Sequence, residues 1–358
     1  MKKVLSIVLS ALLTAVLFTS CADSGNSKTE ETTAAAKTDA ELSAYINDKL
    51  ADIKYNGVIY LTHNDNIVFQ RATGTDENGD PLTIDTSMYI GSVSKQFCAA
   101  AVMILRDQGK LSVDDTIDKY FPEYDRGGDV TVKHLLTMRS GIRDTVGEGF
   151  ANTLPYGKTE EENTALIKEW IFSQSLLFEP GSSFVYSNSN YILLADIVEQ
   201  VSGQYYNDFL REYIFDPLDM KHTGLITEIP DSPAWAENLI CDSEVEEVKR
   251  KGVTKGAGDI VSNAPDMVKW MEGLSGGKIV SQDTLREMTV DYSPDHGEKY
   301  GYGLTQMFVG GIGHEGAISN YSSIDYFTPD SGYCFFCDSN GSDPGNMATL
   351  LLSEYLSE

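Results

Sequence analysis

The chain has 358 residues, of which 41% are hydrophobic and 23% charged, a composition typical of a folded globular protein with a sizeable core. Its formal net charge is −27, from 54 acidic and 27 basic residues. This balance excludes a protein that binds nucleic acid through a basic face, and beyond that an acidic surface reports mainly solubility.

The N-terminus is typical of a bacterial export signal. Lys2 and Lys3 precede an apolar run over 4–18, which is shorter than the ~20 residues that a membrane-spanning helix needs. Small residues then stand directly before Cys21, in a pattern that resembles a lipoprotein cleavage site. We therefore predict a signal peptide over 1–21, lipidation of Cys21, and an extracytoplasmic protein held on a bacterial membrane by that lipid. If the signal is cleaved without lipidation, the protein is secreted; an uncleaved anchor is the alternative interpretation.

Residues 22–38 are small and polar, as expected of a flexible linker. The folded domain is predicted to cover 39–358. Leu42, Ile46 and Leu50 recur at helical intervals over 39–52, and two apolar runs around residues 64–66 predict a β-hairpin.

Helical periodicity dominates from 90 to about 285, with predicted helices over 91–109, 131–138, 162–173, 190–201, 204–213 and 264–274. Strand patterns return after Tyr300, over 302–309, 319–327 and 332–339, and a last helix is predicted over 344–357. The pattern indicates an α+β fold in which both ends of the chain (about 39–89 and 286–358) form one antiparallel sheet flanked by terminal helices. An all-helical inserted region (about 90–285) completes it. A site is expected in the cleft between the two parts.

The cysteines beyond Cys21 predict neither a metal site nor a redox pair. Cys334 and Cys337 form a C-x-x-C spacing, but residues three apart in a strand point to opposite faces. Cys98 lies in an apolar helix and is predicted to be a small core residue. We expect free, buried thiols, and no metal or cofactor.

Ser92 and Lys95 open the most apolar predicted helix and lie on one face of it. A serine hydroxyl becomes a good nucleophile only when a neighbouring base removes its proton. A lysine can do this when desolvation lowers its pKa from ~10.4. The same spacing is also compatible with an N-cap serine and a lysine whose stem packs on the core. A second S-x-x-K, Ser275 to Lys278, lies in a glycine turn and is set aside.

A second motif, Tyr186-Ser187-Asn188, stands just before another predicted helix. A tyrosine near a lysine can relay protons, and an amide can hold a substrate carbonyl without a change of charge. When the triplet is taken alone, a polar turn that caps the helix from Tyr191 is the better explanation.

The third motif is H-x-G, which occurs at His222 and at His314. Only His314 lies among strand-like runs, in a glycine-rich segment where a substrate backbone could approach an edge strand. We therefore select His314 and Gly316, with the Ala317 N–H as an oxyanion donor opposite Ser92. His222 is predicted to be a surface turn residue, and His134 a capping or core residue.

Taken in order, S-x-x-K at the start of a helix, Y-x-N before another and H-x-G on a late strand resemble the serine β-lactamase-like family. The likeness is closest to its branch of class C β-lactamases, D-Ala-D-Ala carboxypeptidases and esterases. It extends to T-V-K-H-L-L-T-M-R-S-G-I, Y-I-F-D-P-L-D-M-K-H-T-G and G-A-G-D-I-V-S-N-A-P-D-M-V-K-W-M. The resemblance implies the β-lactamase/transpeptidase-like fold.

The resemblance also implies a role for each matching residue. Ser92 would be acylated, Lys95 would accept its proton, and Tyr186 would relay protons and serve as the deacylation base. Asn188 would hold the substrate carbonyl, and His314 and Gly316 would lie on the substrate-binding strand. His314 stands where class C β-lactamases carry lysine, which favours a peptidase or an esterase. The acidic Glu315 beside it disfavours a substrate carboxylate nearby.

We therefore expect a serine hydrolase that forms an acyl-enzyme on a D-Ala-D-Ala-type peptide, an ester or a β-lactam. Carboxypeptidase or esterase activity is favoured over β-lactamase activity, and the substrate could be a peptidoglycan stem peptide. The alternative is a non-catalytic penicillin-binding-like lipoprotein that serves as a sensor or a wall-interaction module.

Overall fold

The computed structural model describes residues 38–51, 53, 55–76, 79–231, 250–340 and 349–356. The predicted signal peptide, Cys21 and all but the last residue of the predicted linker lie outside these residues. So do Cys241 and the first part of the predicted C-terminal helix, whose described part forms a π-helical turn (Thr349–Ser353) and α11 (Glu354–Leu356).

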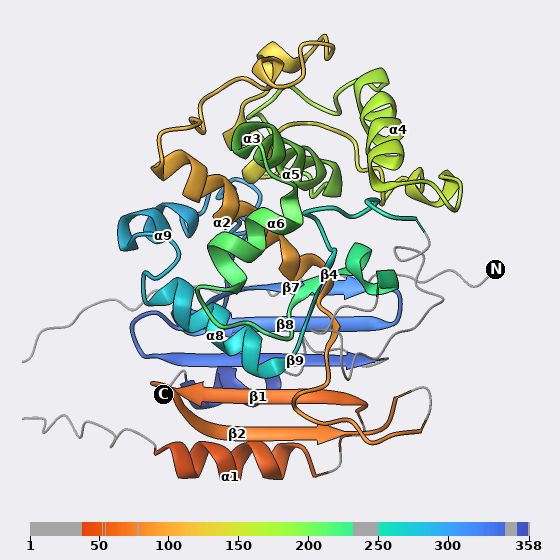
Figure 1. The fold of residues 1–358 in the computed structure, drawn as a ribbon. Helices are drawn as coiled ribbons and strands as arrows, with labels where there is room; N and C mark the ends of the chain where they lie inside the picture. Colours follow the sequence, from red (N-terminus) through yellow and green to blue (C-terminus); the bar gives the residue numbers. More distant parts are fainter. Residues whose placement is uncertain are drawn as a thin grey trace, which may run out of the picture. The chain divides into compact units, whose positions relative to one another are not determined.

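The main sheet has six antiparallel strands in the order β2-β1-β9-β8-β7-β6. Its strands are β1 (Gly57–His63), β2 (Asn66–Thr73), β6 (Thr305–Gln306), β7 (Ile312–Ile318), β8 (Tyr321–Phe327) and β9 (Tyr333–Asn340). Strands from both ends of the chain meet at the β1–β9 pair, as Figure 1 shows. Asn64 and Asp65, both at positive φ, form the two-residue turn of the predicted β1–β2 hairpin. The predicted α+β class is confirmed, and so is the prediction that strands from both ends of the chain form one antiparallel sheet.

Apolar side chains cover both faces of this sheet. On β1, Val58 and Tyr60 belong to one core, while Ile59 and Leu61 belong to a second core on the opposite face. The first core is closed by α8 (Ala264–Ser275), which contacts β1, β8 and β9. The second is closed by α1 (Asp39–Lys49) and the C-terminal turn. The sheet is therefore a rigid support with buried residues on both sides.

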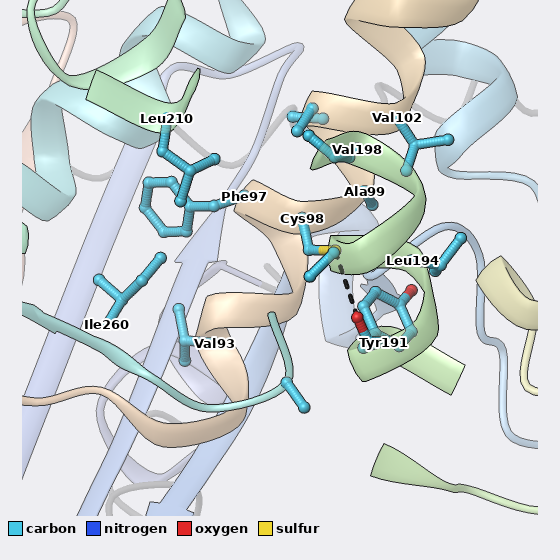
Figure 2. Packing of buried hydrophobic residues seen from close by; sticks show 14 of the residues in the cluster. Val93, Phe97, Cys98, Ala99, Val102, Tyr191, Leu194, Val198, Leu210 and Ile260 are labelled. Carbon is cyan, nitrogen blue, oxygen red and sulfur yellow. Dashed lines mark hydrogen bonds between the residues drawn. The ribbon is translucent and has the colours of Figure 1, made fainter. Parts of the chain in front are cut away.

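The inserted region packs around α2 (Ser94–Asp107), in which every residue from 94 to 105 is buried. Figure 2 shows Phe97, Ala99 and Val102 of this helix in the core that it shares with Tyr191, Leu194 and Val198 of α5 (Asn188–Ser202). The other described α-helices are α3 (Val132–Leu136), α4 (Glu160–Ser173), α6 (Tyr206–Leu210), which continues as a π-helical turn (Arg211–Phe215), and α9 (Gln282–Met288). None of the described helices is both long and apolar enough to cross a bilayer.

The structure differs from the predicted elements in several places. The region expected to be all-helical also contains β4 (Gly224–Leu225) and β5 (Ile260–Ser262), which form a small sheet with β3 (Met88–Tyr89). Strands of two or three residues have no measurable period, so the pattern could not reveal them. The predicted strand over 302–309 is reduced to β6, because the chain turns at 308–310. The predicted helix over 91–109 begins with a 3₁₀ turn (Gly91–Val93), and α9 was not predicted.

The cysteine predictions hold for the residues that the structure describes. Cys98, Cys334 and Cys337 are free and buried. Cys334 belongs to one core and Cys337 to the other, so they do lie on opposite faces of β9. The Cys98 thiol donates to the Tyr191 carbonyl oxygen at 3.7 Å (Figure 2), and burial raises the thiol pKa well above its usual range.

Candidate active site

Ser92 lies in the 3₁₀ turn that leads into α2, and Lys95 is in the first turn of that helix. Ser92 is half-buried, whereas the Lys95 side chain is completely buried. The Lys95 Nζ lies 3.0 Å from the Ser92 Oγ. The structure therefore brings these two residues into direct contact, and α2, the most deeply buried helix, holds both in place.

Two further oxygen atoms complete the surroundings of the Lys95 amine. Its Nζ donates to the Asn188 Oδ1 at 2.8 Å and to the Ala257 carbonyl oxygen at 2.5 Å. Both oxygens can only accept a hydrogen bond, but the Ser92 hydroxyl can also donate. A neutral amine has two N–H groups and one lone pair. The geometry therefore fits a neutral Lys95 that donates to these two oxygens and accepts the Ser92 proton.

Burial is also what lowers the basicity of this amine. It lowers the pKa of Lys95 to about 7, and the negative charge of Asp144 opposes the shift in part. No carboxylate oxygen lies within ion-pair distance of Nζ in the described structure. A large share of the lysine is therefore neutral near pH 7, as a proton acceptor must be.

Tyr186 is placed above the amine, with the centre of its ring 4.8 Å from the Lys95 Nζ. Its hydroxyl oxygen is buried and has no hydrogen-bond partner within the described part of the chain. Burial raises the pKa of Tyr186 well above its usual range, and the nearby Ser92 hydroxyl opposes only part of this shift, without the geometry of a formed hydrogen bond. The side chain is therefore a neutral phenol that can pass a proton on.

Asn188 is the first residue of α5, and Asp144 holds it in place. The Asn188 Nδ2 donates to both Asp144 carboxylate oxygens, at 3.1 and 3.3 Å, and its backbone N–H donates to Asp144 Oδ1 at 3.1 Å. The amide oxygen therefore faces Lys95. Only the second N–H of Nδ2 is then available for the expected hydrogen bond from Asn188 to a substrate carbonyl.

A loop from the inserted region supplies the Ala257 carbonyl, and a buried ion cluster anchors it. Lys255 is buried, and its Nζ lies 3.1 Å from the Glu160 carboxylate and 2.6 Å from that of Glu199. These contacts tie the loop to α4 and α5. Sequence reasoning did not select Asp144, Ala257 or Lys255, because each acts through contacts with residues far away in the chain.

Strand β7 lies against the Ser92 turn, at a distance that requires two glycines. A Cβ on Gly91, which has φ +51°, would lie 2.7 Å from the Ala317 nitrogen, and a Cβ on Gly316 would lie 2.0 Å from the Ile90 carbonyl oxygen. The His314 N–H donates towards β8, to Asp325 Oδ1 at 2.9 Å. Backbone groups alternate along a strand, so the Ala317 N–H points away from β8. Strand β6 pairs only with Ile312 and Gly313, so in the described sheet no strand covers this N–H.

His314 is buried near Tyr186, with 6.2 Å between the ring centres. Its Nδ1–H donates to the Glu315 carbonyl oxygen at 2.5 Å, so its Nε2 accepts from the Tyr300 hydroxyl at 3.2 Å. Burial and the charge of Lys95 lower the pKa of His314 to about 3. The imidazole is therefore neutral at physiological pH and adds no positive charge to the site.

The two motif copies that were set aside, and His134, lie outside this site. His134 caps α3, where its Nδ1 accepts from the Thr131 N–H at 3.2 Å, as predicted for a capping residue. His222 lies in the turn before β4, and its N–H donates to Asp266. Ser275 ends α8 and bonds within that helix. Among the described residues, no group of three His, Cys, Asp or Glu side chains could hold a metal ion.

Known proteins share this fold and sequence pattern. The family model "Beta-lactamase" matches residues 42–353. The chain is 29% identical to the D-aminopeptidase of Brucella anthropi over 281 residues, with 74% of this chain and 52% of that protein covered, so it spans about half the length of that relative. The structure resembles the octameric penicillin-binding protein homologue from Pyrococcus abyssi, with a TM-score of 0.73, 28% identity, and 89% and 77% of the two chains covered.

A third similar structure is the D-amino acid amidase from Ochrobactrum anthropi SV3 complexed with D-phenylalanine. Its TM-score is 0.72 at 25% identity, with 88% of this chain and 98% of that chain covered. The family model covers most of the chain, including Ser92, Lys95 and Tyr186. The chain belongs to the beta-lactamase family.

Proposed function

We propose that the protein is a serine hydrolase that works through an acyl-enzyme on Ser92. The observation that carries the proposal is the contact between the Ser92 hydroxyl and a fully buried lysine whose other two partners can only accept hydrogen bonds. This arrangement provides a nucleophile and a base in one place.

In the acylation step, the Ser92 Oγ attacks the carbonyl carbon of an ester or amide while its proton passes to the neutral Lys95 amine. The oxyanion is positioned to accept from the backbone N–H groups of Ser92 and Ala317. When the intermediate collapses, the bond to the leaving group breaks and the leaving group takes a proton from the lysine ammonium by way of the Tyr186 phenol.

Deacylation reverses these proton transfers. A water molecule attacks the acyl carbon, its proton passes to the Tyr186 and Lys95 pair, and the Ser92 Oγ recovers a proton as the acid leaves. The net reaction consumes one water molecule for each ester or amide bond. Because the Tyr186 phenol is neutral, Lys95 is the resting base and Tyr186 the relay.

The substrate class within this reaction is an acyl compound of the D-amino acid type, cleaved as a peptide, amide or ester. The names of a D-aminopeptidase and of a D-amino acid amidase among the relatives support this choice. The neutral His314, in place of a lysine, supports peptidase, amidase or esterase activity over β-lactam hydrolysis.

The first test is intact mass spectrometry after incubation with a penicillin, beside assays on a p-nitrophenyl ester and a D-alanyl peptide. We expect an acyl adduct or turnover that Ser92→Ala lowers by at least ~1,000-fold. Ser275→Ala, in the second S-x-x-K copy, is the matched control and should keep full activity. Absence of both adduct and turnover in the wild type would instead favour the non-catalytic binding lipoprotein.

We further propose that Cys21 carries a lipid and places the enzyme on the outer side of a bacterial membrane. The apolar run that ends in small residues before Cys21 supports this proposal. Metabolic labelling with an alkyne fatty acid should label the wild-type chain in the membrane fraction but not Cys21→Ala. Equal labelling of both chains, or wild-type protein found only in the medium, would contradict it.

A further inference from the structure

A cavity of about 590 Å³ lies beside the proposed catalytic residues, large enough for a drug-sized ligand. Tyr186 and His314 form part of its wall, so it is one side chain away from Lys95 and Ser92. Its other lining residues include the aromatic Phe184, Tyr300 and Phe308, together with Met307 and the acidic Glu298 and Glu315. A substrate bound at Ser92 can therefore extend into this cavity past Tyr186.

Among the described residues, the charged side chains of this wall are all acidic. Glu298 and Glu315, both exposed, are acidic residues of the wall, and none of the described lysines or arginines lines the cavity. The histidine of the wall is neutral. Lys299 stands next to Glu298 in the chain but is not among the lining residues. Aromatic rings and Met307 make up much of the remaining surface, and rings of this kind attract cations through their faces.

Resting on the proposed function, we infer that this cavity receives a positively charged group of the substrate, such as a primary ammonium, and rejects a carboxylate there. Glu298 and Glu315 are the specificity-determining residues. A cation gains from both carboxylates and from the aromatic faces, whereas an anion meets no cationic partner among the described residues of the wall and is repelled. A D-Ala-D-Ala peptide with its free C-terminal carboxylate in this cavity would therefore be a poor substrate.

The test uses substrates with the same scissile ester and an ammonium, a neutral or a carboxylate group on the acyl part, and a second series with these groups on the leaving part. In one of the two series we expect kcat/KM to fall at least tenfold from the ammonium to the carboxylate compound. The preference should weaken in high salt. Glu298→Gln with Glu315→Gln should bring the three rates in that series within about twofold of one another.

The matched control is Glu123→Gln with Glu169→Gln, which removes the same charge from exposed positions outside the cavity wall. It should keep the wild-type order. Equal rates across both series in the wild type, a preference for carboxylate, or an unchanged order in the Glu298 and Glu315 double variant would overturn the inference.

Binding to Ser92→Ala separates this inference from the proposed function. Calorimetry with the amide analogues of the same compounds requires no turnover, and the ammonium analogue should bind at least tenfold more tightly than the carboxylate analogue. If the wild type is inactive but this order holds, the proposed function fails and the inference stands. If the neutral ester is cleaved but neither rates nor affinities depend on charge, only the inference fails.

Discussion

At the scale of single residues, the site depends on one buried amine whose protonation state decides whether it can act. Lys95 is placed at a helix start that removes it from water, and its partners are a hydroxyl, an amide oxygen and a carbonyl oxygen. Because none of these carries a full negative charge, nothing in direct contact compensates for the burial of an ammonium group. Burial without a contacting counterion therefore lowers the pKa of Lys95, and this allows the lysine to act as a base.

The pH dependence of acylation follows from this residue. With a pKa of about 7, Lys95 is protonated and inactive at low pH, so kcat/KM should rise about tenfold per pH unit well below pH 7 and level off above it. Lys95→Arg, which stays charged, should abolish activity, while Lys278→Arg in the second S-x-x-K copy should not change it. A profile that is flat between pH 5 and 8 would contradict the role of Lys95.

Asp144 should set the midpoint of that profile. Its charge is the strongest of those that raise the Lys95 pKa against burial. Asp144→Asn removes the charge but keeps an oxygen for the Asn188 N–H, so the midpoint of the kcat/KM profile should move to lower pH. Asp330→Asn, an exposed substitution with the same charge change, should leave the midpoint in place. A midpoint that moves upwards in Asp144→Asn would show that the carboxylate acts in some other way.

At the scale of elements, the site is assembled where the 3₁₀ turn before α2 meets the open edge of β7. Glycines at 91 and 316 allow backbone to lie against backbone, so that the Ser92 turn and the Ala317 N–H come together. A side chain at either position would push the two elements apart.

Gly91→Ala tests this contact. Gly91 combines a positive φ with a neighbour 2.7 Å from the added Cβ, whereas Gly109 has φ +72° and nothing within 4 Å. Gly109→Ala should cost only the ~1–2 kcal/mol of an unfavourable φ and keep activity. Gly91→Ala should lower the free energy of unfolding by more and slow acylation by at least ~100-fold. Urea unfolding and adduct formation measure the two effects; equal behaviour of the two variants would refute the close-packing argument.

At the scale of the whole molecule, buried polar side chains join the helical and sheet parts. Gln96, next to Lys95, donates to Asp325 of β8 at 2.5 Å and accepts from the Trp270 indole at 2.9 Å. Asp325 also accepts from the His314 N–H. The nucleophile helix and the substrate strand are thus connected through one fully buried carboxyl group, and α8 joins them through Gln96.

That carboxyl group should make stability depend on pH. Burial raises the pKa of Asp325 to about 7, above its value in the unfolded chain, so the folded state binds more protons between about pH 4 and 7. The free energy of unfolding should therefore fall as pH rises through this window. Asp325→Asn should remove this part of the slope, up to ~1.4 kcal/mol per pH unit.

Urea unfolding of both proteins at several values between pH 4 and 8 measures this difference. Asp259, whose pKa burial also raises to about 7, and Asp338 remain in both proteins, so only the difference between the two curves reports Asp325. Parallel curves would show that burial does not raise the pKa of the Asp325 carboxyl group.

Local patterns sufficed to predict the class of fold, the N-terminal helix α1, the β1–β2 hairpin and the three motifs. Helical and strand periodicities are properties of neighbouring residues, and S-x-x-K needs only one helical turn to bring Ser92 near Lys95. The same local logic separated His134, as a cap, from His314, on a strand. It failed for β4, β5 and β6, whose strands are too short to have a period.

The tertiary structure alone decided how the motifs combine. The Lys95 pKa depends on burial by α5 and on Asp144. The partner of Lys95 at Ala257 and the partner of Gln96 at Asp325 are more than 150 residues away in the chain. The cavity wall likewise unites Tyr186, Glu298 and Glu315 from separate segments. Burial, electrostatic shifts and cavity shape are sums over neighbours in space, and a linear pattern contains these neighbours but does not say which of them meet.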